Sequence, residues 1–411
     1  MHAPVVFLHA CQYPGGLLDR MPQPTWRSQD RAPEAAADAF GPVPGPAHTA
    51  RARTAALIGS RFPSRRRIEL WAGDRIYIDA AAGLFEPSAG SPAATADAGA
   101  SRTLAARRHR EALVRAYDTV DRWPFPTTSS TRVRQGCAID DHEIVDNWEP
   151  SAHPDRRKAL GALRDAGVKV FKDRRGASWP ANALWGSGTW HHIRAFVFDT
   201  RTEREHRSVS SLAHAHIVGK EQRGAFERWL GDRTASAYGF RLALSPSILL
   251  PRRLETAASP ASALRSDAWD GYPASLHWLL ALLAEKNVDD VIFLSGDEHL
   301  ACGVEAEVTR LDNQTPTARL WSVHTSAMYA PYPFANGRPE HFADETSFDF
   351  EHNSSNGPGR YRCTLRHVGF GPVDTAGFVT VDLDRRGSSG GPCATFHAAA
   401  GPAEDVELLP G

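Results

Sequence analysis

Several features that mark particular classes of protein are scarce or missing in this sequence of 411 residues. The formal net charge is only -1, so no long-range field favours nucleic acid or an anionic membrane as a partner. The five cysteines are scattered and odd in number, and they form neither a zinc-ligand spacing nor an obvious disulfide framework. No apolar run approaches the roughly 20 residues that a membrane-spanning helix needs. The remaining composition is that of an ordinary globular protein.

The start of the sequence lacks the pattern of a signal peptide. The apolar residues 5–8 are too few for its central region, and no basic segment precedes them. We therefore expect a cytoplasmic protein, unless an upstream segment has been left out. The glycine-rich loops that hold nucleotide phosphates, Gly-x-x-x-x-Gly-Lys and Gly-x-Gly-x-x-Gly, are also missing, so no nucleotide cradle is predicted.

The most informative stretch that is present spans residues 290–299. Residues 291–294 form a continuous apolar run, which is typical of a strand buried on both faces of a parallel sheet. Asp297 and His299 follow it, at the strand end where α/β sheets bind ligands. Two such side chains can reach one metal ion, although a turn Asp beside a surface His explains this stretch alone equally well.

The same arrangement recurs upstream of this stretch. Candidate ligands also follow the apolar residues 5–8, 68–72 and 137–139, namely Cys11, Asp74 and Asp141. Because parallel strands point their carboxyl ends to one edge, these side chains could converge there with Asp297. Without a cation they would repel one another and resist ionisation. Carboxylates suit calcium, whereas a thiolate, or a phenolate such as that of Tyr77, suits iron, so two or more ions are predicted.

Hydrophobic periodicity predicts an α/β protein along the rest of the chain. We expect helices at residues 102–119, 154–166, 220–232 and 272–286, and further strands at 192–199, 240–244, 377–383 and 393–396. For residues 22–54 we expect a loop with room for one short helix, and for residues 88–100 a surface loop. We expect a single domain over residues 1–400, followed by a frayed tail over residues 401–411.

Seven short motifs carry a resemblance to a known family. They are ACQYP at 10–14, GDRIY at 73–77, DDHE with DNW at 140–148, DTRT at 199–202, SDAWDGYP at 266–273, SGDEH at 295–299 and YPFAN at 332–336. In this order they resemble the PhoD-like metallophosphatases, the alkaline phosphatase D family within the calcineurin-like metallophosphoesterases. The chain departs from the family at Glu298, where Val is usual, and at Arg75, where an uncharged residue is common.

The resemblance implies the calcineurin-like metallophosphoesterase fold, an α/β fold in which two packed mixed β-sheets are flanked by helices in four αββα layers. It also implies an iron ion with calcium ions, and hydrolysis of phosphate mono- or diesters in a small-molecule or lipid-like substrate. By motif, the metal ligands would be Cys11, Asp74, Tyr77, Asp141, Asn147, Asp297 and His299.

Three residues are candidates for catalysis: His142, Asp141 and Arg201. His142 stands where related phosphoesterases keep a histidine that assists the leaving group or orients the phosphate. Together with Asp141 it belongs to a run of four titratable residues after an apolar step, which a core position does not explain. Arg201 either pairs with Asp199 or holds a phosphate bidentately. The expected reaction is in-line attack by a hydroxide formed from metal-bound water.

Two other classes of function fit the same residues. A metal-binding protein of this fold could keep the cluster without turnover, and an interaction scaffold could use the long Pro/Ala-rich loops. Hydrolysis of a chromogenic phosphodiester separates an enzyme from the first class. Binding that survives alanine at Asp74 and Asp141 would favour the second.

Overall fold

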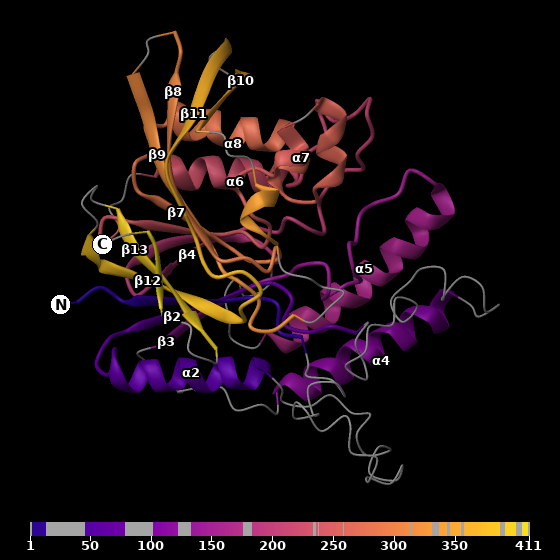
Figure 1. Ribbon diagram of the computed structural model, residues 1–411. Helices are drawn as coiled ribbons and strands as arrows, with labels where there is room; N and C mark the ends of the chain where they lie inside the picture. The colour runs from indigo at the N-terminus through magenta and orange to yellow at the C-terminus, as the bar shows by residue number, and fades with distance from the viewer. Residues whose placement is uncertain are drawn as a thin grey trace.

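The computed structural model describes residues 2–13, 46–78, 102–121, 133–175, 183–232, 236, 238–257, 259–312, 315–330, 337–342, 346–354, 357–386, 391–399 and 405–409. Over these residues the chain forms a six-stranded and an eight-stranded sheet that pack face to face, with helices on the outer faces (Figure 1). This is the predicted four-layer αββα arrangement. None of the helices in the described part of the chain is long and apolar enough to cross a membrane. The cytoplasmic location stays a prediction.

The six-stranded sheet has the order β14-β13-β12-β1-β2-β3. Its strands are β1 (Val5–His9), β2 (Arg67–Ala72), β3 (Val133–Ala138), β12 (Gly377–Arg386), β13 (Pro392–Ala398) and β14 (Val406–Leu409). β1 pairs in parallel with β2, and β2 pairs in parallel with β3. The carboxyl ends of these three strands therefore lie side by side at one edge of the sheet.

The eight-stranded sheet has the order β10-β11-β8-β9-β7-β6-β5-β4. Its strands are β4 (Gly186–Trp190), β5 (Ile193–Val197), β6 (Arg241–Leu244), β7 (Val291–Ser295), β8 (Cys302–Arg310), β9 (Thr315–His324), β10 (Ser347–Ser354) and β11 (Gly357–Phe370). The central strands β5, β6, β7 and β9 are parallel, and antiparallel strands complete both sides.

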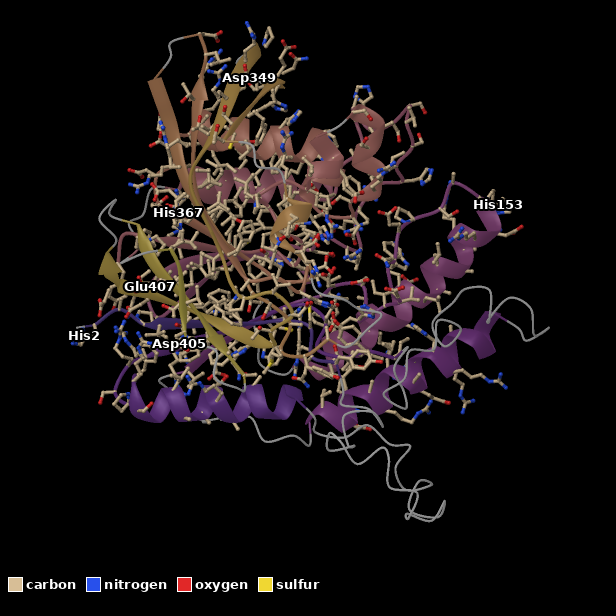
Figure 2. The ribbon with its side chains drawn as sticks, viewed as in Figure 1. His2, His153, Asp349, His367, Asp405 and Glu407 are labelled. Atoms are coloured by element: carbon tan, nitrogen blue, oxygen red, sulfur yellow. The ribbon has the colours of Figure 1, made fainter. Side chains whose placement is uncertain are left out.

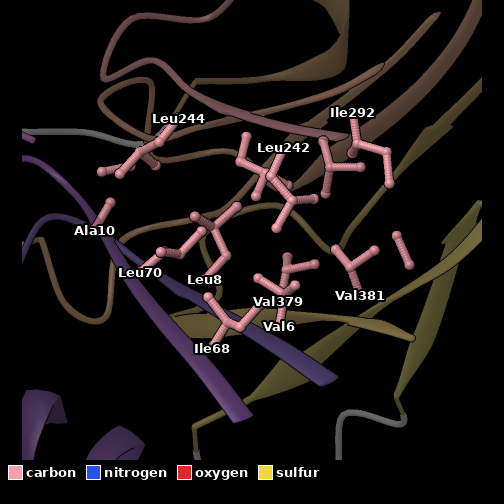
Figure 3. Packing of buried hydrophobic residues seen from close by; sticks show 14 of the residues in the cluster. Val6, Leu8, Ala10, Ile68, Leu70, Leu242, Leu244, Ile292, Val379 and Val381 are labelled. Atoms are coloured by element: carbon pink, nitrogen blue, oxygen red, sulfur yellow. The ribbon is translucent and has the colours of Figure 1, made fainter. Parts of the chain in front are cut away.

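The main core lies between the two sheets. Val6 and Leu8 of β1 belong to the same buried cluster as Leu242 of β6 and Ile292 of β7, and Figure 3 shows the two sets facing each other. Side chains alternate across a strand, so Phe7 of β1 points to the opposite face, toward α2. β1 is buried on both sides, which explains its unbroken apolar run. Each such aliphatic side chain contributes roughly 1.5–3 kcal/mol on burial.

Helices cover the outer face of each sheet. They are α2 (Pro46–Ser60), α4 (Arg102–Asp121), α5 (Pro154–Arg174), α6 (Lys220–Gly231), α7 (Leu254–Ala257) and α8 (Pro273–Glu285), with short 3-10 turns η3 (Pro260–Arg265), η4 (Trp269–Gly271) and η5 (Pro339–His341). Leu113 of α4 and Leu163 of α5 pack with Trp71 of β2. On the other side, Phe226 of α6 and Leu280 of α8 pack on the larger sheet. α5 projects beyond the sheets, with His153 beside its N-terminal end (Figure 2).

The predicted helices and strands are present, with several differences. Residues 401–411 were expected to be a frayed tail, but Val406–Leu409 forms β14, because β13 offers it a partner and Leu408 and Leu409 become buried. α5 extends to Arg174, since Val170 and Phe171 continue its buried stripe. Strands β4 and β8 to β11 were not predicted. Of the loop expected at residues 22–54, the part from Pro46 onward belongs to α2, which continues to Ser60, and residues 22–45 lie outside the described residues. The loop at residues 88–100 and the motif at 332–336 lie outside the described residues.

Candidate metal centre

The candidate ligands lie just beyond four strand ends. Cys11, Asp74 and Asp141 follow β1, β2 and β3 of the smaller sheet, whereas Asp297 follows β7 of the larger sheet. The convergence predicted from the sequence is present, but it joins two sheets instead of one edge. The sheets touch at Gly296, where a Cβ atom would lie 2.3 Å from the Cβ of Ala10. A glycine is required there for the β7 ligand loop to approach the other three.

Five of the seven predicted ligands have a left-handed backbone. The φ angles are 54° at Cys11, 55° at Asp74, 50° at Asn147, 93° at Asp297 and 53° at His299. This conformation is uncommon outside glycine, and it persists only where the surrounding structure enforces it. Such positions cluster at functional sites, so the backbone independently marks these residues.

Asp74 occupies the middle of the centre. Ligand atoms form three groups in which all members lie within 4.8 Å of one another: Cys11, Asp74 and His299; Asp74, Asp141 and His142; and Asp74, Asp140, Asp141 and Asp297. Asp74 belongs to every group, so its carboxylate is placed to bridge more than one cation.

One side of Asp74, which we call the thiol–phenol half, consists of Cys11, Tyr77 and His299. The Sγ of Cys11 lies 3.6 Å and the hydroxyl of Tyr77 lies 3.4 Å from Oδ2 of Asp74. The same hydroxyl lies 3.4 Å from Nε2 of His299. Burial raises the pKa values of the Cys11 thiol and the Tyr77 phenol well above their ordinary values, and the neighbouring Asp74 adds to both shifts. These donors stay neutral without a cation, and a bound cation would favour their ionised forms.

The other side, the carboxylate half, consists of Asp140, Asp141 and Asp297. Oδ2 of Asp140 and Oδ1 of Asp141 are buried and have no hydrogen-bond partner among the described residues. Burial raises the pKa of Asp297 well above its ordinary value, and Asp140 adds to the shift. Unpartnered carboxylate oxygens in one buried cluster fit a hard cation such as calcium, which takes several oxygen ligands.

Arg201 supplies the permanent positive charge of the carboxylate half. Its side chain is fully buried, and its Nε and NH1 atoms lie 2.6 Å from Asp140 and 2.8 Å from Asp267. NH2 faces Asp141 at 3.5 Å and Asp297 at 3.7 Å, beyond hydrogen-bond distance. Asp199 binds the backbone N–H of Arg201 instead of its guanidinium group. Of the two interpretations from the sequence, pairing of this guanidinium group with Asp199 is therefore wrong.

His142 lies where the two halves meet. Its ring packs against Tyr77 at a tilt of 37° with centroids 4.0 Å apart, and Nε2 lies 4.0 Å from Asp141 and 3.7 Å from Asp146. Asn147 is exposed; its backbone N–H donates to Asp141 at 2.7 Å and its side-chain amide to Asp146 at 3.0 Å. The role of Asn147 as a ligand stays a prediction.

Sequence reasoning assigned no role to Glu143, although it stands in the DDHE motif. The buried carboxylate of Glu143 accepts backbone N–H groups from Asp74 at 3.0 Å, Arg75 at 2.7 Å and Asp140 at 2.9 Å. It therefore fixes the loops after β2 and β3 relative to each other. Asp140 and Asp267, the partners of Arg201, were also missed, and the only signal in the sequence was their place in two of the quoted motifs.

The two-sheet fold and the donors at its strand ends define a protein built around a candidate metal centre, and comparison with known proteins identifies the family. A family model described as PhoD-like phosphatase matches residues 65–387. Because this match covers most of the chain, the chain belongs to the PhoD-like phosphatase family.

Two relatives place the chain further. Alkaline phosphatase D of Bacillus subtilis (strain 168) is 27% identical over 181 residues, which cover 39% of this chain and 30% of that protein. The match thus spans less than a third of that relative's length. A solved structure described as the structure of PhoD superposes with a TM-score of 0.53 at 14% identity, covering 100% of this chain and 72% of that one. At this identity the likeness shows the fold alone.

Proposed function

We propose that this protein is a metal-dependent phosphoester hydrolase acting on phosphate mono- or diesters of small-molecule or lipid-like compounds. The observation that carries the proposal is the position of Asp74, whose carboxylate lies between a thiol–phenol half and a carboxylate half. Membership of the PhoD-like phosphatase family supports the reaction class.

The two halves suit different ions. Cys11, Tyr77 and His299 offer sulfur, phenol oxygen and imidazole nitrogen, which together with Asp74 favour iron. Asp141 and Asp297 offer oxygen only and favour calcium, with Asp74 as the shared ligand. Asn147 would complete the oxygen set from the rim.

Bound cations supply charge neutralisation for the phosphoryl group and acidify the attacking water. The chain supplies the rest. NH2 of Arg201, which has no hydrogen-bond partner among the described residues, is aimed at the centre and can donate to a phosphoryl oxygen. Nε2 of His142 faces Asp146 at the rim, where it can deliver a proton to the departing alcohol.

Metal analysis combined with an activity assay tests the proposal. Purified protein should contain iron and calcium, and chelation should abolish hydrolysis of 4-nitrophenyl phosphate and bis(4-nitrophenyl) phosphate. The two ions together should restore activity best. Full activity in metal-free protein would refute metal dependence. Metal-loaded protein that hydrolyses neither ester would refute the enzyme and support a metal-binding protein without turnover.

A further inference from the structure

A cleft of about 470 Å³ opens beside the metal centre. Asp146, Asn147 and Asp267 line it. Asp146 lies 3.7 Å from Nε2 of His142, and Asp267 binds NH1 of Arg201 at 2.8 Å. The cleft therefore adjoins the centre on the side of His142, where the alcohol would depart. Its volume is in the range of pockets that bind small molecules.

The wall of the cleft includes an apolar surface. Trp148 and Leu160 are buried and line the cleft together with Leu264. The indole N–H of Trp148 already donates to the carbonyl of Leu160 at 3.1 Å. The indole thus needs no polar partner from a ligand, and this apolar part of an otherwise mostly polar wall suits a hydrocarbon segment.

Four arginines also line the cleft, and they differ in how their charge is balanced. Arg207 pairs with Glu149, and Arg253 forms a two-pronged pair with the buried Glu298. The charges of these two arginines are balanced by Glu149, which also lines the cleft, and by Glu298, so the two arginines help to build the wall.

The other two arginines are exposed. Arg156, in the first turn of α5, has no hydrogen bond or ion pair among the described residues. Arg265, at the end of η3, has an exposed side chain that pairs at 3.9 Å with Glu255, which is itself exposed. Such pairs are weak. The mouth of the cleft therefore presents two guanidinium groups, a side chain suited to phosphate and carboxylate.

We propose that this cleft is a subsite for a leaving group that carries a second anionic group. The second anion binds Arg156 and Arg265 at the mouth, and the carbon chain between the two anions lies on Trp148, Leu160 and Leu264. This inference rests on the proposed function, because it names the class of ester that the same centre would cleave. A free phosphate, a carboxylate or a lipid-like anion at the end of the leaving group shares the required chemistry.

A series of synthetic esters tests the subsite. Hexyl phosphate carries no second anion, whereas hexane-1,6-diyl bisphosphate and 5-carboxypentyl phosphate carry a phosphate or a carboxylate, and 6-aminohexyl phosphate carries a cation. Each is offered as the monoester and as the methyl diester, and kcat/KM is measured. The anionic esters should exceed hexyl phosphate by about tenfold, the size of one charge-assisted hydrogen bond. The kcat/KM of the aminohexyl ester should be lower than that of hexyl phosphate. Added salt should bring these ratios of kcat/KM closer to one.

The variants are the double change Arg156→Gln with Arg265→Gln, and the control Arg164→Gln. Arg164 lies on the same helix but pairs with Asp165 and does not line the cleft. The double change should bring the ratio of kcat/KM for the anionic ester to kcat/KM for the neutral ester close to one. The control should leave this ratio unchanged. Equal kcat/KM for anionic and neutral esters in the unaltered protein, or a ratio that survives the double change, would overturn the subsite.

Calorimetric binding of the same esters separates this inference from the proposed function. If no ester is hydrolysed, the proposed function fails, and the ratio of binding constants still decides the subsite. Tighter binding of hexane-1,6-diyl bisphosphate than of hexyl phosphate, lost in the double variant, would support it. Equal binding would overturn it.

Discussion

The two halves of the centre differ in how they bury polar groups. In the thiol–phenol half the donors are neutral without a cation, because burial raises the pKa values of Cys11 and Tyr77. In the carboxylate half, burial opposes ionisation of Asp141, but Arg201, His142 and the backbone N–H of Asn147 together outweigh it and lower that pKa. Even beside Arg201 the pKa values of Asp140 and Asp297 stay raised, so the one guanidinium group favours the ionised form at only one of the three carboxylates, whereas the thiol and the phenol are buried in their neutral forms.

The largest effect is expected where the halves meet. Asp74→Asn should abolish hydrolysis and release both ions, because it removes the one carboxylate that both halves share. Mutation of residues that merely support a metal ligand already costs about 10–100-fold. Metal content and kcat/KM provide the measurement. Asp349→Asn, on β10 far from the centre (Figure 2), is the control. Loss of one ion alone would show that Asp74 serves a single half.

The next largest effect concerns His142, which touches both halves. His142→Ala should keep the metals but lower the rate about 10²–10⁴-fold for an alkyl ester, the usual contribution of general acid catalysis. For a nitrophenyl ester the loss should be smaller, since nitrophenolate leaves without a proton. Equal losses for the two esters would instead assign His142 to phosphate orientation or metal binding.

The variant Arg201→Gln tests the two halves through the free energy of unfolding and its recovery by each ion. Removing one partner of a buried ion pair costs about 3–5 kcal/mol, so the metal-free variant should be destabilised by that amount in denaturant unfolding. Calcium should recover part of the loss, because it replaces the missing positive charge, whereas iron should recover less. Arg362→Gln, which breaks the exposed pair with Asp349, should cost less than about 1 kcal/mol. Equal recovery by the two ions would contradict the assignment of the halves.

The smallest effect comes from one ligand in each half. Cys11→Ser should lower the affinity for iron about tenfold, and Asp297→Asn should lower the affinity for calcium about tenfold. Each change should have little effect on the affinity for the other ion. A tenfold loss of affinity for one ion lowers the free energy of unfolding of the loaded protein by about 1.4 kcal/mol. Metal-free Asp297→Asn should be no less stable than the unaltered protein, because one repelling carboxylate is gone. Thermal melting with each ion provides the comparison, and identical metal-induced shifts in the unaltered protein and Asp297→Asn would remove Asp297 from the site.

The strands that carry ligands were predictable because both their faces are buried. β1 and β7 each contain an unbroken apolar run, residues 5–8 and 291–294, and the candidate ligands Cys11 and Asp297 lie three residues beyond these runs. β10 was missed although Phe348 and Phe350 alternate with exposed residues, which is the local pattern of a half-buried strand. The pairing of β10 depends on partners elsewhere in the chain, which a local pattern does not reveal.

The centre itself was predictable only in part. Cys11, Asp74 and Asp297 were named from their positions after strands, and the structure brings them together. The sequence led to Asp141 as the candidate ligand, but the role of its neighbour Asp140 was not predictable, because it depends on the long-range position of Arg201, whose Nε lies 2.6 Å from Asp140. Nor does the sequence reveal that β7 belongs to the opposite sheet.

The three hydrogen bonds of Glu143 affect the radius of the ion that the centre can accept. Because this single carboxylate fixes the loop of Asp74 against the loop of Asp140 and Asp141, the gap between those loops is set by one side chain. Asp297 comes from the other sheet and is not held by Glu143, so an ion of different radius must be accommodated on its side. We expect lanthanides of graded radius to bind the unaltered protein with one sharp optimum, and Glu143→Gln to broaden that optimum. An unchanged radius profile in the variant would show that the gap is set elsewhere.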